Sequence, residues 1–146
     1  MNFTDFITNH GKRIHREHYI HLVQIARTDG KIEKSELELL YKEGKKFGLT
    51  DPEIDKLIKS EGEHHYMPPY SLMEKFDELY NIAEMILADD VVTDSERRMI
   101  NRYAIAAGFS DKTIEKLVEL LFEGIKKGRD EEELLREFRK RHLFKE

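Results

Sequence analysis

The fold is decided by a stretch that occurs twice, Ile25-Ala26-Arg27-Thr28-Asp29-Gly30-Lys31-Ile32-Glu33-Lys34-Ser35-Glu36 and Met85-Ile86-Leu87-Ala88-Asp89-Asp90-Val91-Val92-Thr93-Asp94-Ser95-Glu96. The second copy lies sixty residues after the first, and the match continues without a gap to Leu57 and Leu117. Such an internal repeat indicates a duplicated structural unit. Eight positions are identical in both copies: Asp29/Asp89, Ser35/Ser95, Glu36/Glu96, Gly48/Gly108, Asp51/Asp111, Ile54/Ile114, Lys56/Lys116 and Leu57/Leu117.

Apolar residues recur with the period of an α-helix through both copies. Their spacing predicts helices over 14–28, 34–47, 71–88, 97–107 and 112–127. No segment of useful length alternates with period two, so we expect no β-sheet. Gly44 and its counterpart Ala104 are small, which suits helices that cross closely.

The turns between helices also have readable signals. Gly48 and Gly108 stand where a helix ends and a left-handed residue is needed. Thr50 and Ser110 follow as expected N-caps of the next helix, and Thr50 is followed by Glu53 in capping-box spacing. Folding therefore explains the identical residues at these joints.

These signals predict a single all-α domain of seven to eight helices over residues 1–146. Repeat 1 covers about 14–59, a loop covers 60–71, and repeat 2 covers about 72–127. The tail is expected to form a last amphipathic helix at about 130–142, with Leu134, Leu135 and Phe138 available for docking. One repeat cannot bury its own apolar stripes, so we expect the two to pack about an approximate twofold axis.

Composition limits the classes of function. The chain has no cysteine, which excludes disulfides, thiolate metal sites and a thiol nucleophile. It has no apolar run long enough to cross a membrane and no visible secretory signal, so we expect a cytoplasmic protein. Residues 61–128 hold 8 Lys/Arg against 14 Asp/Glu, which disfavours nucleic-acid binding and suits a cation, a basic partner or simply a solvated face.

The acidic turns are the part of the repeat that folding explains least. Asp29 and Asp89 each follow the end of a helix, where the negative end of the dipole disfavours a carboxylate. One interpretation is local: Asp bonds backbone N–H groups two residues on, and Thr93 with Glu96 forms a capping box. The other is a divalent-cation site for calcium or magnesium, whose ligands would be Asp29, Glu36, Asp89, Asp90 and Glu96.

Two more specific metal motifs fail or stay weak. An EF-hand loop would need ligands at Ile25 and Arg27, which belong to the preceding helix, so these turns are not EF-hands. His15 and His18 are spaced i, i+3 on the first long helix and could bind a transition metal only with a further ligand. His18 falls on the apolar stripe, which favours a core histidine, and His64-His65 is expected at a loop tip.

The pattern Ala-x-x-Asp-Gly-x-[Ile/Val]-x-x-x-Glu at residues 26–36, with a second copy at 86–96, resembles the signature of TerB-like proteins of the tellurite-resistance family. The resemblance covers about residues 14–127. It implies an all-helical fold, a bacterial stress or tellurite-resistance context, and metal binding through Asp29, Glu36, Asp89 and Glu96. Asp90 stands where the motif has Gly, so that turn is either strained or held by local bonds.

The function expected from these observations is non-catalytic binding or scaffolding with protein partners, with a divalent cation at the paired acidic turns as one candidate ligand. The alternative is a metal-free interaction module that uses the loop 61–71 and the tail 129–146 as its surface. A metal-dependent enzyme is the third and least favoured hypothesis. The sequence has neither a phosphate-loop motif nor a nucleophile-elbow motif, which counts against catalysis.

Overall fold

The computed structural model describes residues 16–27, 32–61 and 65–143, and this part of the chain forms seven α-helices and no strand. The all-α prediction is therefore confirmed for the described residues. A helix over residues 16–26 comes first, and the others are α2 (Lys34–Lys46), α3 (Asp51–Glu61), α4 (Leu72–Ile86), α5 (Asp94–Ala107), α6 (Asp111–Lys126) and α7 (Glu131–Phe138). Two short helices, η1 (Leu87–Asp89) and η2 (Arg139–Leu143), follow α4 and α7. The chain divides into two compact units, Met1–Tyr66 and Met67–Glu146.

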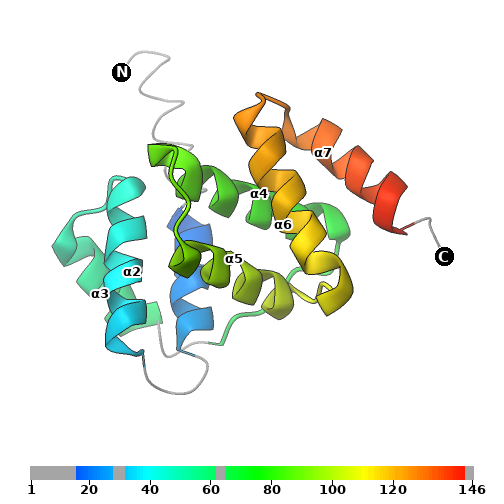
Figure 1. Cartoon of the computed structure of the whole chain (residues 1–146). Helices are drawn as coiled ribbons and strands as arrows, with labels where there is room; N and C mark the ends of the chain where they lie inside the picture. Colours follow the sequence, from blue (N-terminus) through cyan, green and yellow to red (C-terminus); the bar gives the residue numbers. More distant parts are fainter. Residues whose placement is uncertain (1–15, 28–31, 62–64, 144–146) are drawn as a thin grey trace, which may run out of the picture. The chain divides into compact units, whose positions relative to one another are not determined.

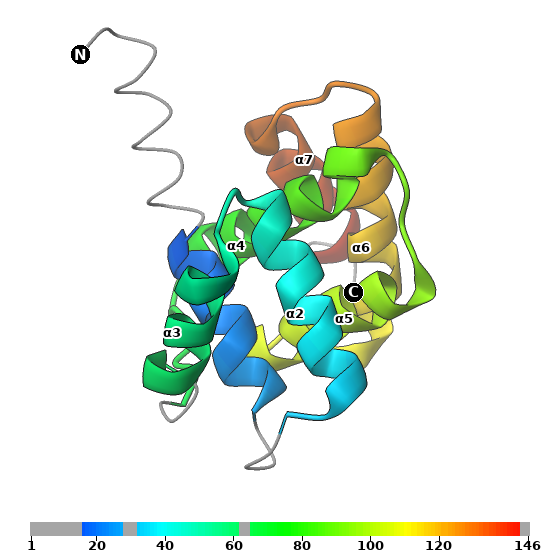
Figure 2. The ribbon, with the colours of Figure 1, turned by 90° about the vertical axis from the view of Figure 1, so that its left-hand side faces the viewer.

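The first unit packs α2 against α3, which lie side by side in Figure 2. Tyr19, from the helix over residues 16–26, is fully buried and donates a 2.6 Å hydrogen bond to the carbonyl oxygen of Leu40 on α2. A Cβ atom added to Gly44 on α2 would lie 2.7 Å from Cδ1 of Ile54 on α3. Gly44 thus allows a close approach of α2 and α3 within this unit, because the missing side chain lets Ile54 reach the α2 backbone.

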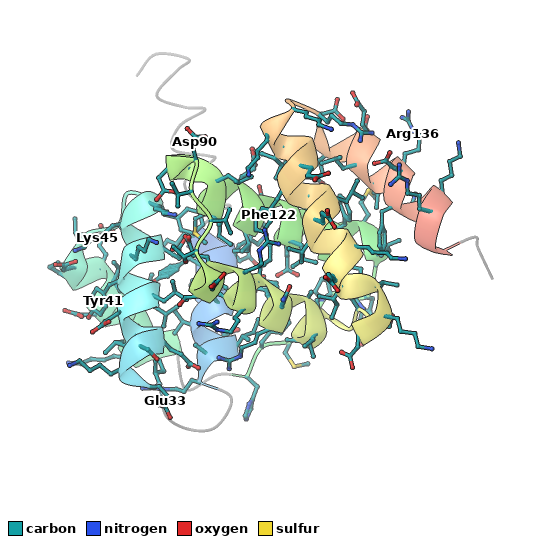
Figure 3. The ribbon with its side chains drawn as sticks, viewed as in Figure 1. Glu33, Tyr41, Lys45, Asp90, Phe122 and Arg136 are labelled. Atoms are coloured by element: carbon teal, nitrogen blue, oxygen red, sulfur yellow. The ribbon has the colours of Figure 1, made fainter. Side chains whose placement is uncertain are left out.

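The second unit is built on α4, α5 and α6, which contact one another, and α7 lies along α6 (Figure 1). Phe122 belongs to the face of α6 that meets α5, where the Arg97 guanidinium carbon lies 5.4 Å from its ring centroid (Figure 3). Leu134, Leu135 and Phe138 of α7 are buried, so the predicted docking of the tail helix is confirmed. That helix departs from α-helical geometry after Phe138, where the π-helical η2 takes over.

Glycines end the helices where the sequence predicts. Gly48 and Gly108 adopt φ of +87° and +101°, a left-handed conformation that residues with a Cβ rarely take. The next residues, Leu49 and Phe109, donate backbone hydrogen bonds back to the carbonyls of Gly44 and Ala104, at 3.0 and 3.1 Å. These bonds satisfy carbonyls at the helix ends that would otherwise lack a partner.

Helix starts depend on caps, and two of the expected caps differ in kind. Thr50 and Glu53 form the predicted capping box, with 3.0 Å from the Thr50 backbone N–H to Glu53 Oε1. Ser110 occupies the N-cap position of α6, but its side chain makes no capping hydrogen bond and lies instead 3.2 Å from the Thr113 hydroxyl. The helix predicted at 97–107 begins earlier, at Asp94, because Thr93 caps it.

Candidate functional site

The second acidic turn joins α4 to α5 through η1. Asp90 ends η1 in a left-handed conformation, with φ of 60° and ψ of 8°, at the turn where Figure 3 labels it. Its backbone N–H donates a 2.9 Å hydrogen bond to the carbonyl oxygen of Leu87. The sequence left two alternatives for Asp90, a strained turn or a turn held by local bonds, and the structure has both features. The backbone takes a conformation that favours glycine, and a local hydrogen bond closes the turn.

Asp89 is exposed, and its carboxylate is used in the turn itself. Oδ1 of Asp89 accepts a 3.2 Å hydrogen bond from the backbone N–H of Val91, two residues further on. This is the local Asp turn anticipated as the structural explanation of the residue. The bond offsets the unfavourable end of the helix dipole by giving the carboxylate a backbone donor.

Glu96 is fully buried and completes the capping box of α5. Its Oε1 accepts hydrogen bonds from the backbone N–H of Thr93 at 3.0 Å and from the Thr93 hydroxyl at 3.1 Å. The Thr93 hydroxyl oxygen in turn accepts from the Glu96 backbone N–H at 3.1 Å. The cap interpretation of Glu96 is confirmed, and these bonds direct one carboxylate oxygen inward to the helix start.

The first acidic turn is described only in part. Asp29 lies outside the described residues, and Glu36 lies half-buried in the first turn of α2. Glu33 holds the N-cap position without a side-chain capping bond, as its residue type predicts. Among the residues that the structure describes, no three His, Cys, Asp or Glu side chains gather in a group that could hold a metal ion. The five-carboxylate cation site remains a prediction from sequence.

Three described histidines belong to the first unit: His18, His21 and His65. His18 is buried, in agreement with the prediction of a core histidine, and its ring centroid lies 6.2 Å from that of His21. His21 meets Tyr66 edge-on, with centroids 5.1 Å apart. His65 is exposed, as expected for the loop. His15 and His64 lie outside the described residues.

A second acidic cluster, which sequence reasoning missed, lies where α7 meets α4. Glu131, the first residue of α7, has its side chain hydrogen bonded to that of Asp77 on α4. Partial burial, that hydrogen bond and the negative charges of Asp77, Glu84 and Glu132 raise the pKa of Glu131 from 4.5 to about 8. No spacing pattern links Asp77 to Glu131, because the two are far apart along the chain.

An exposed apolar segment precedes α4. Met67 and Met73 keep 79% and 58% of their surface exposed, and Tyr70 is fully exposed. Pro68 and Pro69 separate Met67 from Tyr70, and Ser71 caps α4 by accepting a 3.1 Å hydrogen bond from the Glu74 backbone N–H. We call residues 67–73 the docking segment. The sequence indicates a surface at the loop 61–71, but not that Met67 and Tyr70 in this loop, and Met73 just after it, are exposed to solvent.

Comparison of the chain with family models, with curated proteins and with solved structures found no significant match. No helix in the described part of the chain is long and apolar enough to cross a membrane.

Proposed function

We propose that this chain is a non-catalytic binding protein whose partner is another protein, which it contacts through the docking segment. The observation that carries the proposal is the exposure of Met67, Tyr70 and Met73 within seven residues. A single exposed apolar side chain is ordinary on a protein surface. A contiguous group of large ones is more typical of a surface that binds a partner.

The chemistry of the docking segment suits recognition by a protein groove. Each proline fixes its own φ, so Pro68-Pro69 loses little conformational entropy when it is bound. Extended proline-containing segments dock in grooves lined with aromatic side chains. Tyrosine is enriched among the residues that dominate binding energy, and methionine adapts its shape to irregular surfaces.

The start of α4 gives the docking segment a rigid support. Met73 lies in the first turn of α4, and Tyr70 lies immediately before the capping residue Ser71. The cap satisfies a backbone donor that the helix start would leave free. A side chain held at such a helix start enters a partner pocket with less loss of freedom than one on an unsupported loop.

Two further observations support a binding role over catalysis. The carboxylates of Asp89 and Glu96, the strongest candidates for chemistry, are engaged in a turn and a helix cap. The residues that resemble the TerB-like signature imply a binding domain made of two pseudo-symmetric repeats. Helices α2 and α5, and likewise α3 and α6, begin at the sixty-residue offset of the sequence repeat. The stress or tellurite-resistance context is an expectation carried by that resemblance.

Site-specific photo-cross-linking tests the proposal. A photoreactive phenylalanine analogue replaces Tyr70 in the full chain, and the matched control carries the analogue at Glu119, an exposed position of α6. We expect position 70 to form a covalent adduct with a specific protein that position 119 does not capture. Adducts that are equal at the two positions would contradict binding through the docking segment.

Divalent-cation binding at the acidic turns is the second hypothesis, and it has a separate test. Calorimetric titration with calcium compares the wild type with a variant carrying Asp29→Asn and Asp89→Asn. The cation hypothesis requires saturable binding by the wild type at millimolar calcium and its loss in the variant. An absence of binding by the wild type rejects that site and leaves the protein-binding proposal untouched.

A further inference from the structure

A groove with a volume of about 300 Å³ lies between α5 and α6 in the second unit. Arg97, Asn101 and Ile105 follow one another at one-turn spacing along its α5 side. Ile114 and Val118 line its α6 side. Ligand pockets usually have volumes of about 300–1,000 Å³, so this groove suits a single side chain better than a large cofactor.

The two ends of the groove differ in charge. Asp111 and Glu115 line it where α6 begins. Arg97 lines the other end, where its guanidinium carbon lies 5.4 Å from the ring centroid of Phe122, two turns beyond Glu115 on α6. Lys75 of α4 approaches the end of α5 but does not line the groove. The positive end of the α6 dipole offsets only about half a charge, so this end of the groove is acidic.

The groove also holds groups that the chain itself leaves unsatisfied. Asn101 Oδ1 is buried and has no hydrogen-bond partner among the described residues, which is unfavourable for a polar atom. Rotation of the amide about χ2 can turn this oxygen towards a ligand. Asp111 is exposed and forms no ion pair with any described residue. Ile105 leaves 54% of its surface to solvent. A ligand with a positively charged donor and an apolar stem would satisfy all three.

The first repeat carries such a group at the corresponding place. Lys45 of α2 stands sixty residues before Ile105, and Asp51, the first residue of α3, stands sixty residues before Asp111. Lys45 Nζ lies 3.4 Å from Asp51 Oδ1, so the lysine side chain reaches from one helix to the start of the next (Figure 3). The second repeat therefore keeps the carboxylate and lacks the lysine that pairs with it.

A second difference between the repeats leaves further space in the groove. Half-buried Tyr41, one turn before Lys45 on α2, corresponds to Asn101, whose side chain is much smaller (Figure 3). The α6 wall keeps the chemical character of its counterpart on α3: Ile54, Asp55 and Ile58 correspond to Ile114, Glu115 and Val118. The groove thus keeps the walls of the first repeat and lacks the two large side chains that α2 supplies there.

We infer that the groove between α5 and α6 binds a lysine side chain of a protein partner, whose ammonium group pairs with Asp111 as that of Lys45 pairs with Asp51. The aliphatic stem lies along Ile105 and Ile114, since lysine can bury its stem on an apolar surface while its charge stays in water. An ammonium group has three donors and no acceptor, which matches two carboxylates and an amide oxygen.

The charge of the surrounding region favours a basic protein as the partner. Residues 61–128 hold 8 Lys/Arg against 14 Asp/Glu, and such a negative field attracts a basic partner and speeds its encounter with the groove. None of the residues that line the groove belongs to the docking segment. The inference therefore does not depend on the proposed binding through that segment, and the two sites have separate tests.

Nuclear magnetic resonance titration of the labelled full chain with N-acetyl-lysine N-methylamide tests the inference. We expect saturable shifts of the Asn101 side-chain amide and of the Ile105 and Glu115 backbone amides, with a dissociation constant in the millimolar range. N-acetyl-norleucine N-methylamide has a similar stem without the ammonium group and should bind at least about threefold more weakly. An absence of saturable shifts with the lysine probe, or equal binding of the two probes, would overturn the inference.

Free lysine separates a partner side chain from a free amino acid, and it should bind no more tightly than the capped probe. A clear preference for free lysine would identify an amino-acid site instead and would also overturn the inference.

Two variants and a matched control place the binding in the groove. Asp111→Asn should raise the dissociation constant of the lysine probe at least about threefold, because it removes the charge that pairs with the ammonium group. Ile105→Lys supplies the lysine of the first repeat and should raise it more than about tenfold by occupying the site. Glu119→Gln removes one charge from an exposed position of α6 outside the groove and should leave it nearly unchanged. A wild-type dissociation constant in Asp111→Asn or in Ile105→Lys would contradict binding at this site.

Discussion

Tyr103 on α5 donates a 2.6 Å hydrogen bond to Oε1 of Glu78 on α4, and both side chains are buried. A carboxyl group in a protein interior is stable only when hydrogen bonds replace its lost water. The bond therefore fixes the position of α5 on α4 and holds a polar group within the apolar core of the second unit.

Replacement of Tyr103 by phenylalanine should lower the free energy of unfolding by about 1.5–3 kcal/mol, because it leaves Glu78 without this donor. Urea unfolding followed by circular dichroism measures the difference. Tyr80→Phe is the control, since Tyr80 is only half-buried and its loss should change stability by less than about 0.5 kcal/mol. Equal losses in the two variants would show that the Tyr103 bond has no special weight.

The two hydroxyl residues predicted as N-caps of the second repeat should differ in stability effect. Thr93→Ala removes the hydroxyl that accepts from the Glu96 backbone N–H and donates to Glu96 Oε1, and it should cost about 1 kcal/mol. Ser110→Ala should cost only a few tenths of that amount, because the Ser110 side chain makes no capping bond. Urea unfolding measures the free energy of unfolding of both variants. A larger loss of stability in Ser110→Ala than in Thr93→Ala would contradict the observed caps.

Asp90→Gly should stabilise the second unit by about 0.5 kcal/mol, since glycine takes the left-handed conformation with less strain. Its gain is limited because glycine also raises the entropy of the unfolded chain. The opposite change at an equivalent conformation, Gly108→Ala, should destabilise by at least about 1 kcal/mol. Thermal unfolding of both variants measures these effects. A lower melting temperature for Asp90→Gly than for the wild type would contradict the described turn.

Glu131→Gln should change the pH dependence of thermal stability. The raised pKa of Glu131, about 8, means that the wild type loses stability as pH rises through that value. The glutamine variant cannot lose a proton there, so it should melt a few degrees above the wild type in alkaline solution. The difference should shrink in mildly acidic solution. Solvent screening of this half-exposed group keeps the effect small. The same difference in melting temperature between the two proteins at every pH would contradict the prediction.

Local signals in the sequence predicted most of the helical framework. Gly48 and Gly108 marked helix ends because the conformation they adopt is set by one residue and its neighbours. The capping-box interpretation of Glu96, one of the two open for this residue, rests on a local signal of the same kind, since its partner Thr93 is three residues away. The docking of α7 was anticipated from Leu134, Leu135 and Phe138, whose spacing gives the helix one apolar face.

The contacts that could not be predicted join residues distant in sequence. Glu78 lies within an amphipathic helix and Tyr103 twenty-five residues later, and nothing local pairs them. Glu131 belongs to a run of charged residues that is typical of a solvated helix face. Its partial burial depends on the position of α4, which periodicity does not specify. Asp29 lies outside the described residues, so the predicted convergence of the acidic turns stays a prediction.

The most direct test is the affinity of the protein captured at position 70 for substituted forms of this chain. Calorimetry compares the wild type, a variant carrying Met67→Ser, Tyr70→Ser and Met73→Ser, and the control Ile105→Ser, which removes an exposed apolar side chain from α5. Loss of three anchors of at least about 1 kcal/mol each should raise the dissociation constant more than about 100-fold. The dissociation constant of Ile105→Ser should stay within about threefold of the wild-type value. Equal affinities for the triple variant and the wild type would contradict binding through the docking segment.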